Sequence, residues 1–204
     1  MKGARKVAPP KAYEDWIALE SDDWKPSYPF NDGLVRDAVI DSLFLAQRGL
    51  CVYCGRALDR SRPGKSFHVE HFRPQHAYKT LEAAFENLFL SCGQDDQQGG
   101  RSQTCGTRKD RWFDEVLHVA PIYPSCISVF EFKLNGGVAG STTPASTMAT
   151  VLNLNHAELV KEREQVLLLI DSGELDVSDF WDDASGIAES YAHVAFQHLG
   201  AVIP

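Results

Sequence analysis

Apolar positions at helical spacing predict a helical start to the chain. Over residues 34–48 such positions recur every three or four residues, which predicts an amphipathic helix. Asp32 precedes this helix as a candidate N-cap, and Gly49 follows it, where glycine commonly ends a helix. A shorter helix is expected over 13–19, with Leu19 among the residues that face inward.

The middle of the chain changes to a strand pattern. Residues 67–72 and 87–91 are short runs of β-branched and aromatic residues, so each predicts a strand. Turns are expected at 51–54 and 61–64, and a single helical turn is expected over 81–85.

A polar stretch without periodicity, residues 93–104, follows these strands and predicts an exposed loop. A helix should begin after it, near Gly106. The residues expected on this helix are Lys109, Trp112, Phe113 and Val116.

The last third of the chain predicts a hairpin and two helices. Residues 127–132 alternate like a strand, and the Asn-Gly-Gly sequence at 135–137 is a hairpin signal. The small residues of 141–146 indicate a linker. Asn155 precedes Glu158 by three positions, which resembles a capping box and predicts a helix to about Ile170. One face of a last helix is expected to carry Phe180, Ala184, Ile187, Tyr191, Val194 and Leu199.

Length and composition indicate one domain, or one domain with an extension, of the α+β class. We divide the 204 residues into a helical lead-in (1–48), a core (49–117) and a C-terminal hairpin with an acidic helical extension (118–204). The basic N-terminus lacks the apolar run of a secretory signal, and no apolar run is long enough to cross a membrane. We therefore expect a cytoplasmic protein with no membrane partner.

Charge is distributed unevenly along the chain. Residues 48–112 carry 11 Lys and Arg against 7 Asp and Glu, a balance of +4. The remainder carries 9 against 21, a balance of −12, and the two parts give the net charge of −8. A local basic excess attracts a polyanion even when the whole chain is acidic. Nucleic acid is therefore the expected partner of the middle segment, with chance scatter of charge as the alternative.

Four of the five cysteines surround the two predicted strands. Zinc binds thiolates tetrahedrally, and two residues between a pair of cysteines allow both to reach one ion. Cys51 and Cys54 have that spacing, whereas twelve residues separate Cys92 from Cys105. A polar loop of that length closes at small entropic cost, so the four predict a structural zinc site, with buried free thiols as the alternative. Cys126 is expected to be a small buried residue.

Between the two cysteine pairs lies the candidate chemistry. His68, Glu70 and His71 fall within four residues. Phosphodiester hydrolysis needs a base to activate water and a metal to neutralise charge on the phosphate. A neighbouring imidazole and carboxylate can divide these tasks, with His71 acting on water and Glu70 on a divalent ion. A histidine taken singly is more often structural.

The motifs resemble those of the HNH endonucleases, whose core is a ββα-metal finger. They are Cys51-x-x-Cys54, Glu70-His71-Phe72-x-Pro74, Asn87-Leu88, Cys92 and Cys105-Gly106-x-x-Lys109. In their amino-acid sequence, these motifs are most similar to those of HNH proteins from Septu-type and retron-associated bacterial defence systems. In these systems an ATPase accompanies the HNH protein. The resemblance covers residues 49–113 and extends more loosely to residues 150–163.

The resemblance implies a zinc-stabilised ββα-metal core with N-terminal and C-terminal helical extensions. It assigns His71 as general base, Glu70 as ligand of a catalytic Mg²⁺ or Mn²⁺, and Asn87 as the brace of the loop that orients the base. It makes Cys51, Cys54, Cys92 and Cys105 ligands of a structural Zn²⁺. Lys109 corresponds to a basic residue near the phosphate. Arg73, Arg108 and Arg111 are further expected contacts to phosphates of a nucleic acid, with a solvated surface charge as the alternative.

One position departs from the family pattern. Many HNH enzymes carry a His or Asn metal ligand directly after the last cysteine, where this chain has Gly106. The missing ligand is expected to come from His68, Asp110 or Asn87, or from water. The sequence therefore predicts an HNH endonuclease that cuts DNA, or RNA, beside an ATPase partner. The alternative is a non-catalytic zinc-stabilised subunit with a degenerate HNH site that binds nucleic acid or protein.

Overall fold

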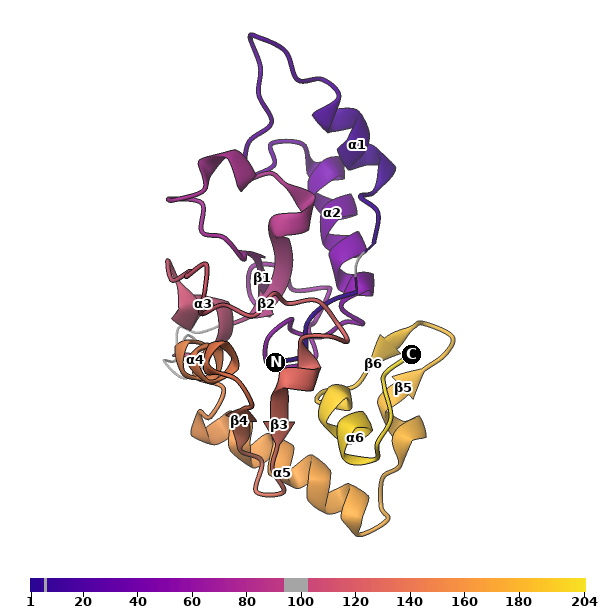
Figure 1. Cartoon of the computed structure of the whole chain (residues 1–204). Coiled ribbons are helices and arrows are strands. Elements are labelled where there is room, and N and C mark those ends of the chain that lie inside the picture. Colours follow the sequence, from indigo (N-terminus) through magenta and orange to yellow (C-terminus); the bar gives the residue numbers. More distant parts are fainter. Residues whose placement is uncertain (6, 94–102) are drawn as a thin grey trace.

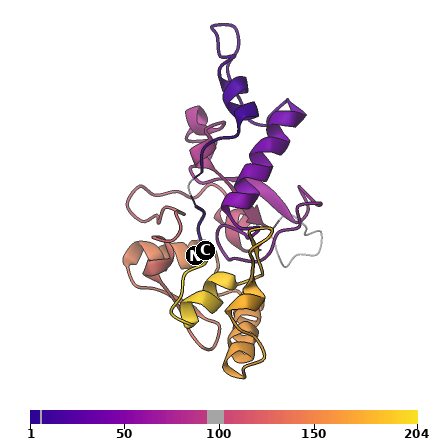
Figure 2. The same ribbon diagram turned by 90° about the vertical axis from the view of Figure 1, so that its right-hand side faces the viewer.

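The chain forms an α+β structure built around a small antiparallel hairpin. The computed structural model describes residues 1–5, 7–93 and 103–204. In two perpendicular views the N-terminal helices lie at one end, the central hairpin in the middle and the longest C-terminal helix at the other end (Figures 1 and 2). No helix within the described residues is long and apolar enough to cross a membrane.

The central hairpin consists of β1 (Phe67–His71) and β2 (Leu88–Cys92), close to the predicted strands. They pair antiparallel, with His68 opposite Ser91 and Glu70 opposite Phe89. Every residue of β2 is buried, so this strand lies in the core. Two short 3₁₀ turns, η1 (Lys79–Leu81) and η2 (Phe85–Asn87), take the place of the helical turn predicted over 81–85.

Helices α1 (Lys11–Ile17) and α2 (Gly33–Ala46) confirm the two helices predicted near the start of the chain. Asp32 caps α2 as predicted, because its carboxylate accepts hydrogen bonds from the backbone N–H groups of Leu34 and Val35. Leu19 was expected to face inward, and that prediction is wrong. The helix ends before it, and Leu19 is 67% exposed.

Helix α3 (Cys105–Lys109) starts where predicted but is much shorter than expected. Asp110 directly follows it with a φ of +46°, a left-handed backbone that ends the helix. Trp112 and Phe113 still pack against the core from the segment beyond it. Val116 does not, because it is 78% exposed.

The predicted hairpin is present as β3 (Phe130–Phe132) and β4 (Val138–Gly140), which pair antiparallel. The residues before it, η4 (Ile127–Val129), form a 3₁₀ turn, so the strand predicted over 127–132 is only half as long. Residues 141–146 are also not a linker. Thr142 caps α4 (Thr143–Val151), and Pro144 lies in its first turn, where it needs no N–H partner.

Helix α5 (Ala157–Asp171) confirms the next predicted helix, but Asn155 does not cap it. Its side chain instead accepts a hydrogen bond from the Val138 N–H and donates one to the Val138 carbonyl, which holds β4. The single helix expected over 180–199 is also wrong. That region contains η5 (Val177–Phe180), β5 (Trp181–Asp182), β6 (Ile187–Ala188) and α6 (Ala192–His198), and Leu199 is exposed.

Arg163 connects the C-terminal hairpin to the helices that cover it. Its side chain is fully buried on α5, and its guanidinium donates to the carbonyls of Gly136 (2.6 Å) and Leu154 (2.7 Å). The carbonyl of Leu152, two residues before Leu154, accepts a hydrogen bond from the Cys105 N–H at 2.9 Å. The C-terminal region thus holds the first residue of α3 in place.

Replacing Arg163 tests this connection. Arg163→Met keeps an aliphatic stem but leaves two buried carbonyls without donors, so we expect a loss of about 1.5–3 kcal/mol of unfolding free energy. Urea unfolding measures it. Lys161→Met, at an exposed position of the same helix, is the control. Equal stability of the two variants would contradict the role given to Arg163.

Candidate functional site

Four cysteine sulfurs converge between the hairpin and α3. Cys51 and Cys54 come from the turn before β1, Cys92 ends β2, and Cys105 begins α3. All four are buried and their Sγ atoms lie within 4.8 Å of one another, with 3.5 Å between those of Cys54 and Cys92. A tetrahedral zinc with bonds of about 2.3 Å needs sulfurs about 3.8 Å apart. The cluster therefore has the composition and the spacing of a structural zinc site.

The local backbone explains how this cluster forms. The Cys92 N–H donates to Cys51 Sγ at 3.4 Å, and the Gly106 N–H donates to Ser91 Oγ at 3.0 Å. Cys105 has a φ of +57°, an uncommon conformation for a residue with a side chain, and its hydrogen bond to Leu152 holds it there. Most of the loop predicted over 93–104 lies outside the described residues.

The cluster favours negative charge on one sulfur, that of Cys51, whereas contacts with neighbouring sulfurs raise the pKa values of Cys92 and Cys105 well above their usual value. Burial disfavours the thiolate of Cys51, but hydrogen bonds from the thiols of Cys105, Cys54 and Cys92 outweigh it. The pKa of Cys51 is therefore lowered well below its usual value. A thiolate is the form that binds metal.

Glu70 lies deep beside this cluster, and its two carboxylate oxygens have different partners. Oε1 contacts the Lys109 ammonium at 2.8 Å and accepts a hydrogen bond from the Tyr53 hydroxyl at 3.0 Å. Oε2 faces His68 Nε2 at 3.3 Å. Burial by itself would raise the pKa of Glu70, but His68 and Lys109 together lower it below its ordinary value. Glu70 is therefore a buried carboxylate that stays ionised at neutral pH.

His71 is held as a neutral imidazole. Its Nε2 lies 2.9 Å from the carbonyl oxygen of Glu82, which can only accept, so Nε2 carries the proton. The Tyr28 ring packs against it with 4.6 Å between centroids. Burial lowers the pKa of His71, which favours the neutral form near pH 7. The remaining nitrogen, Nδ1, then has a free lone pair and can accept a proton.

Asn87 binds the backbone of the loop after β1. Its Oδ1 accepts from the Arg73 N–H at 2.8 Å, and its Nδ2 donates to the carbonyls of Arg73 (3.0 Å) and Leu81 (3.1 Å). Its own carbonyl accepts from the Phe72 N–H. Because both ends of the amide serve the backbone, Asn87 positions the segment that carries His71 and is not free to bind an ion.

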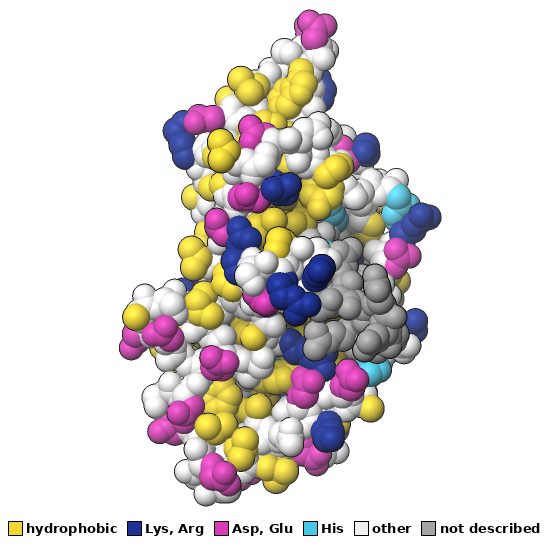
Figure 3. All heavy atoms as spheres, turned by 180° about the vertical axis from the view of Figure 1, so that it is seen from behind, with side chains coloured by type: hydrophobic (Ala, Val, Ile, Leu, Met, Phe, Trp, Pro, Cys, Tyr) yellow, Lys and Arg dark blue, Asp and Glu magenta, His cyan; other side chains and the backbone are white. Residues whose placement is uncertain are grey.

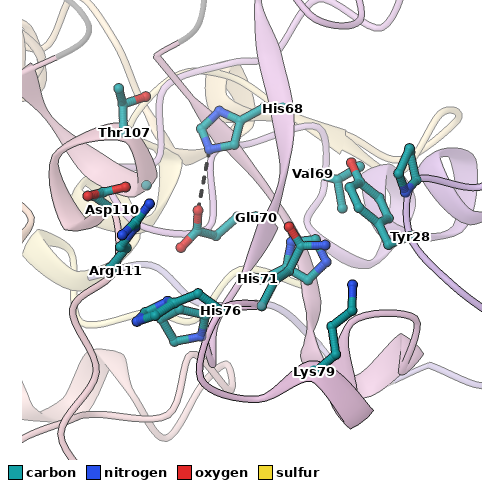
Figure 4. Close-up of a pocket in the computed structure, with 14 residues that line it drawn as sticks. Tyr28, His68, Val69, Glu70, His71, His76, Lys79, Thr107, Asp110 and Arg111 are labelled. Carbon is teal, nitrogen blue, oxygen red and sulfur yellow. Dashed lines mark hydrogen bonds and ion pairs between the residues drawn. The ribbon is translucent and has the colours of Figure 1, made fainter.

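His68, Glu70 and His71 line an open pocket of about 810 Å³, whereas Asn87 is not among its lining residues. In Figure 4, Thr107, Asp110 and Arg111 lie on the side of His68 and Glu70, while Tyr28 and Lys79 lie on the side of His71. The remaining lining residues are Pro29, Val69, Pro74, Gln75, His76 and Gly106.

The four residues predicted to contact nucleic acid lie in different surroundings. Arg73 is half-exposed, lies over two aromatic rings and pairs with Glu115 at 3.3 Å. Arg108 is exposed but does not line the pocket, whereas Arg111 does. The side chain of Lys109 is only 1% exposed and its ammonium contacts Glu70. In this structure Lys109 is therefore a counter-ion of Glu70 and offers no charge at the surface.

Two residues of the site were not identified from the sequence. Tyr53 supplies a hydrogen bond to Glu70, and its position inside the Cys51–Cys54 turn was the available signal. Burial and the charge of Glu70 raise the pKa of Tyr53 well above its ordinary value, so it stays a donor. Tyr28 comes from a segment far away in the sequence, and no local pattern indicated its contact with His71.

Charge is also segregated on the folded surface. Figure 3 shows basic side chains grouped over the middle of one face, with acidic side chains predominating toward the end that holds α5. The sequence agrees, since no Lys or Arg follows Arg163.

No protein-family model matches this chain, and no curated protein matches it. The resemblance to HNH endonucleases therefore stays a prediction from motifs and their spacing.

The cysteine cluster makes a direct prediction about metal content. Purified protein should hold about one zinc per chain, and Cys92→Ser should lower that content because three thiolates bind zinc less tightly than four. Elemental analysis measures it. Cys126→Ser is the matched control, since Cys126 is buried but outside the cluster. A wild-type protein without zinc, or equal loss in both variants, would argue against the site.

Proposed function

We propose that this protein is an HNH endonuclease that hydrolyses phosphodiester bonds of DNA, with RNA as the second substrate to be assayed. The observation that supports this most strongly is the pair formed by a neutral His71 and an ionised Glu70 in one open pocket. The order of hairpin, short helix and cysteine cluster agrees with a ββα-metal core. We further propose a cytoplasmic setting, which suits five free cysteines.

His71 acts as general base in this proposal. Its Nδ1 takes the proton of the attacking water, and the Glu82 carbonyl stabilises the resulting imidazolium through Nε2. Asn87 holds the loop that follows, which keeps the ring oriented. Glu70 holds a divalent cation, Mg²⁺ or Mn²⁺. When bound, that ion neutralises charge on the scissile phosphate and on the leaving oxygen.

Lys109 and Tyr53 position Glu70 for this task. Both contact Oε1, so the carboxylate stays ionised and its other oxygen is directed away from them. Lys109 also donates to the carbonyl of His71 at 3.1 Å, which connects α3 to the proposed base. The cysteine cluster with its zinc serves structure, because it ties α3 to the end of β2 and to the turn before β1.

The partners are proposed on charge and on motif resemblance. The exposed Arg111 and Lys79 at the pocket provide positive charge for a polyanion. By resemblance to Septu-type and retron-associated proteins, we propose an ATPase partner and a role in anti-phage defence.

One observation favours a second candidate. Gly106 has no side chain at the position where many HNH enzymes carry a metal ligand. A non-catalytic zinc-stabilised subunit that binds nucleic acid or protein would also have this feature. Cleavage assays with and without Mg²⁺ or Mn²⁺, and with the partner ATPase, separate the two. Nucleic-acid binding without metal-dependent cleavage would favour the second candidate.

His71→Ala tests the base directly. We expect cleavage to fall by about 10²–10⁴-fold, because general base assistance typically contributes that much. Gel assays on DNA and RNA measure it. His198→Ala is the control, since His198 pairs with Asp171 far from the pocket. Undiminished cleavage by folded, zinc-loaded His71→Ala would show that His71 is not the base.

The pH dependence gives a second test of His71. A general base is active above its pKa, and its activity is lost as the pH falls below that pKa. Since burial lowers the pKa of His71, the acid limb of kcat/KM should lie below the value of about 6.5 for an unperturbed histidine. Tyr28→Ala exposes the ring and should move this limb to higher pH. An unshifted limb in the variant would contradict the role given to burial.

A further inference from the structure

Gly106 on α3 lies directly against two side chains of β1, those of His68 and Glu70. A Cβ atom built on Gly106 would lie 2.4 Å from Glu70 Oε2 and 2.7 Å from His68 Nε2. Real Cβ atoms do not approach other atoms so closely. The position after the last cysteine therefore holds glycine because the ends of two other side chains occupy the space that a larger residue needs.

The two side chains next to Gly106 face each other through one atom each, Oε2 of Glu70 and Nε2 of His68. Glu70 Oε1 is taken by Lys109 and Tyr53, so Oε2 is the oxygen available to an ion. The Nδ1 atom of His68 is buried and has no hydrogen-bond partner among the described residues, while Nε2 faces Oε2.

The separation of these atoms suits a shared cation. Two neighbouring ligands of an octahedral ion, each at about 2.1 Å, lie about 3.0 Å apart. His68 Nε2 and Glu70 Oε2 are 3.3 Å apart, so a shift of a few tenths of an ångström suffices.

No third protein ligand completes this set. In the part of the chain that the structure describes, the cysteine cluster is the only group of three or more His, Cys, Asp or Glu ligand atoms within 4.8 Å of one another. Asp110, although it lines the same pocket, is therefore not within that distance of both atoms. The other coordination positions are open to water and phosphate oxygens, as is usual for an ion that binds substrate.

We infer that His68 and Glu70 together form the divalent-cation site, with the imidazole of β1 replacing the ligand that α3 lacks at Gly106. This inference rests on the proposed function for the purpose of the ion. It also assigns the metal class. Imidazole suits divalent transition-metal ions, of which Mn²⁺ binds most weakly, whereas Mg²⁺ prefers oxygen ligands, so the site should bind Mn²⁺ more tightly than Mg²⁺.

Metal binding to the zinc-loaded full chain tests this without reference to activity. Electron paramagnetic resonance of free Mn²⁺ gives its affinity, and competition with Mg²⁺ gives the preference. We expect His68→Ala to weaken Mn²⁺ binding by more than about 10-fold, since even outer-shell partners are worth that much. It should also reduce the preference over Mg²⁺. His76→Ala, an exposed histidine of the same pocket, is the matched control and should bind Mn²⁺ as the wild type does.

Gly106→Ala provides an independent variant on α3, opposite His68 and Glu70 of β1. Alanine favours a helix, so the backbone of α3 should tolerate it, but its Cβ pushes against both ligand atoms. Mn²⁺ binding should weaken while zinc content stays constant. Thermal unfolding monitors the fold of each variant.

The outcomes separate this inference from the proposed function. Wild-type Mn²⁺ affinity in folded His68→Ala, together with loss of binding in Glu70→Gln, would overturn the role of His68 and leave the nuclease proposal standing. A wild type that binds no Mn²⁺ would overturn the site itself. Mn²⁺ binding that requires both residues, in a protein that cleaves neither DNA nor RNA, would support the site and contradict the nuclease proposal.

Discussion

The convergence of four buried cysteine sulfurs is the constraint on which the rest of the centre depends. A two-stranded hairpin is at best marginally stable in water, and a helix of five residues is too short to persist alone. The cluster joins one turn, the end of β2 and the start of α3, so elements with little stability of their own share one anchor. Zinc binding at such a cluster stabilises small units by about 10–16 kcal/mol in peptide models.

Helix α3 carries three tasks in five residues. Cys105 belongs to the cluster, Gly106 leaves space for the side chains of His68 and Glu70, and Lys109 neutralises Glu70. Buried charges are costly unless they are paired, so the ionised state of Glu70 depends on where α3 lies. The structural site and the candidate active site are therefore coupled through one short helix, and displacement of Cys105 should disturb both.

The C-terminal region supports this helix from outside the predicted core. Leu152 binds the backbone of Cys105, and Arg163 ties the following segment to the β3–β4 hairpin. The Leu152 carbonyl thereby holds the last cysteine, Cys105, in its uncommon conformation. On the face shown in Figure 3, the acidic side chains toward the end that holds α5 lie apart from the basic group in the middle.

The sequence by itself determined the elements whose signals are local. Helix α2 with its Asp32 cap, the two central strands, the β3–β4 hairpin and the grouping of four cysteines follow from periodicity, turn residues and spacing. Only the tertiary structure decided where Lys109, Asn155 and Tyr28 act, because their partners lie far away in the sequence. It also decided why residue 106 is glycine. That reason is the space taken by His68 and Glu70, and no pattern along a chain records the distance between two elements that pack together.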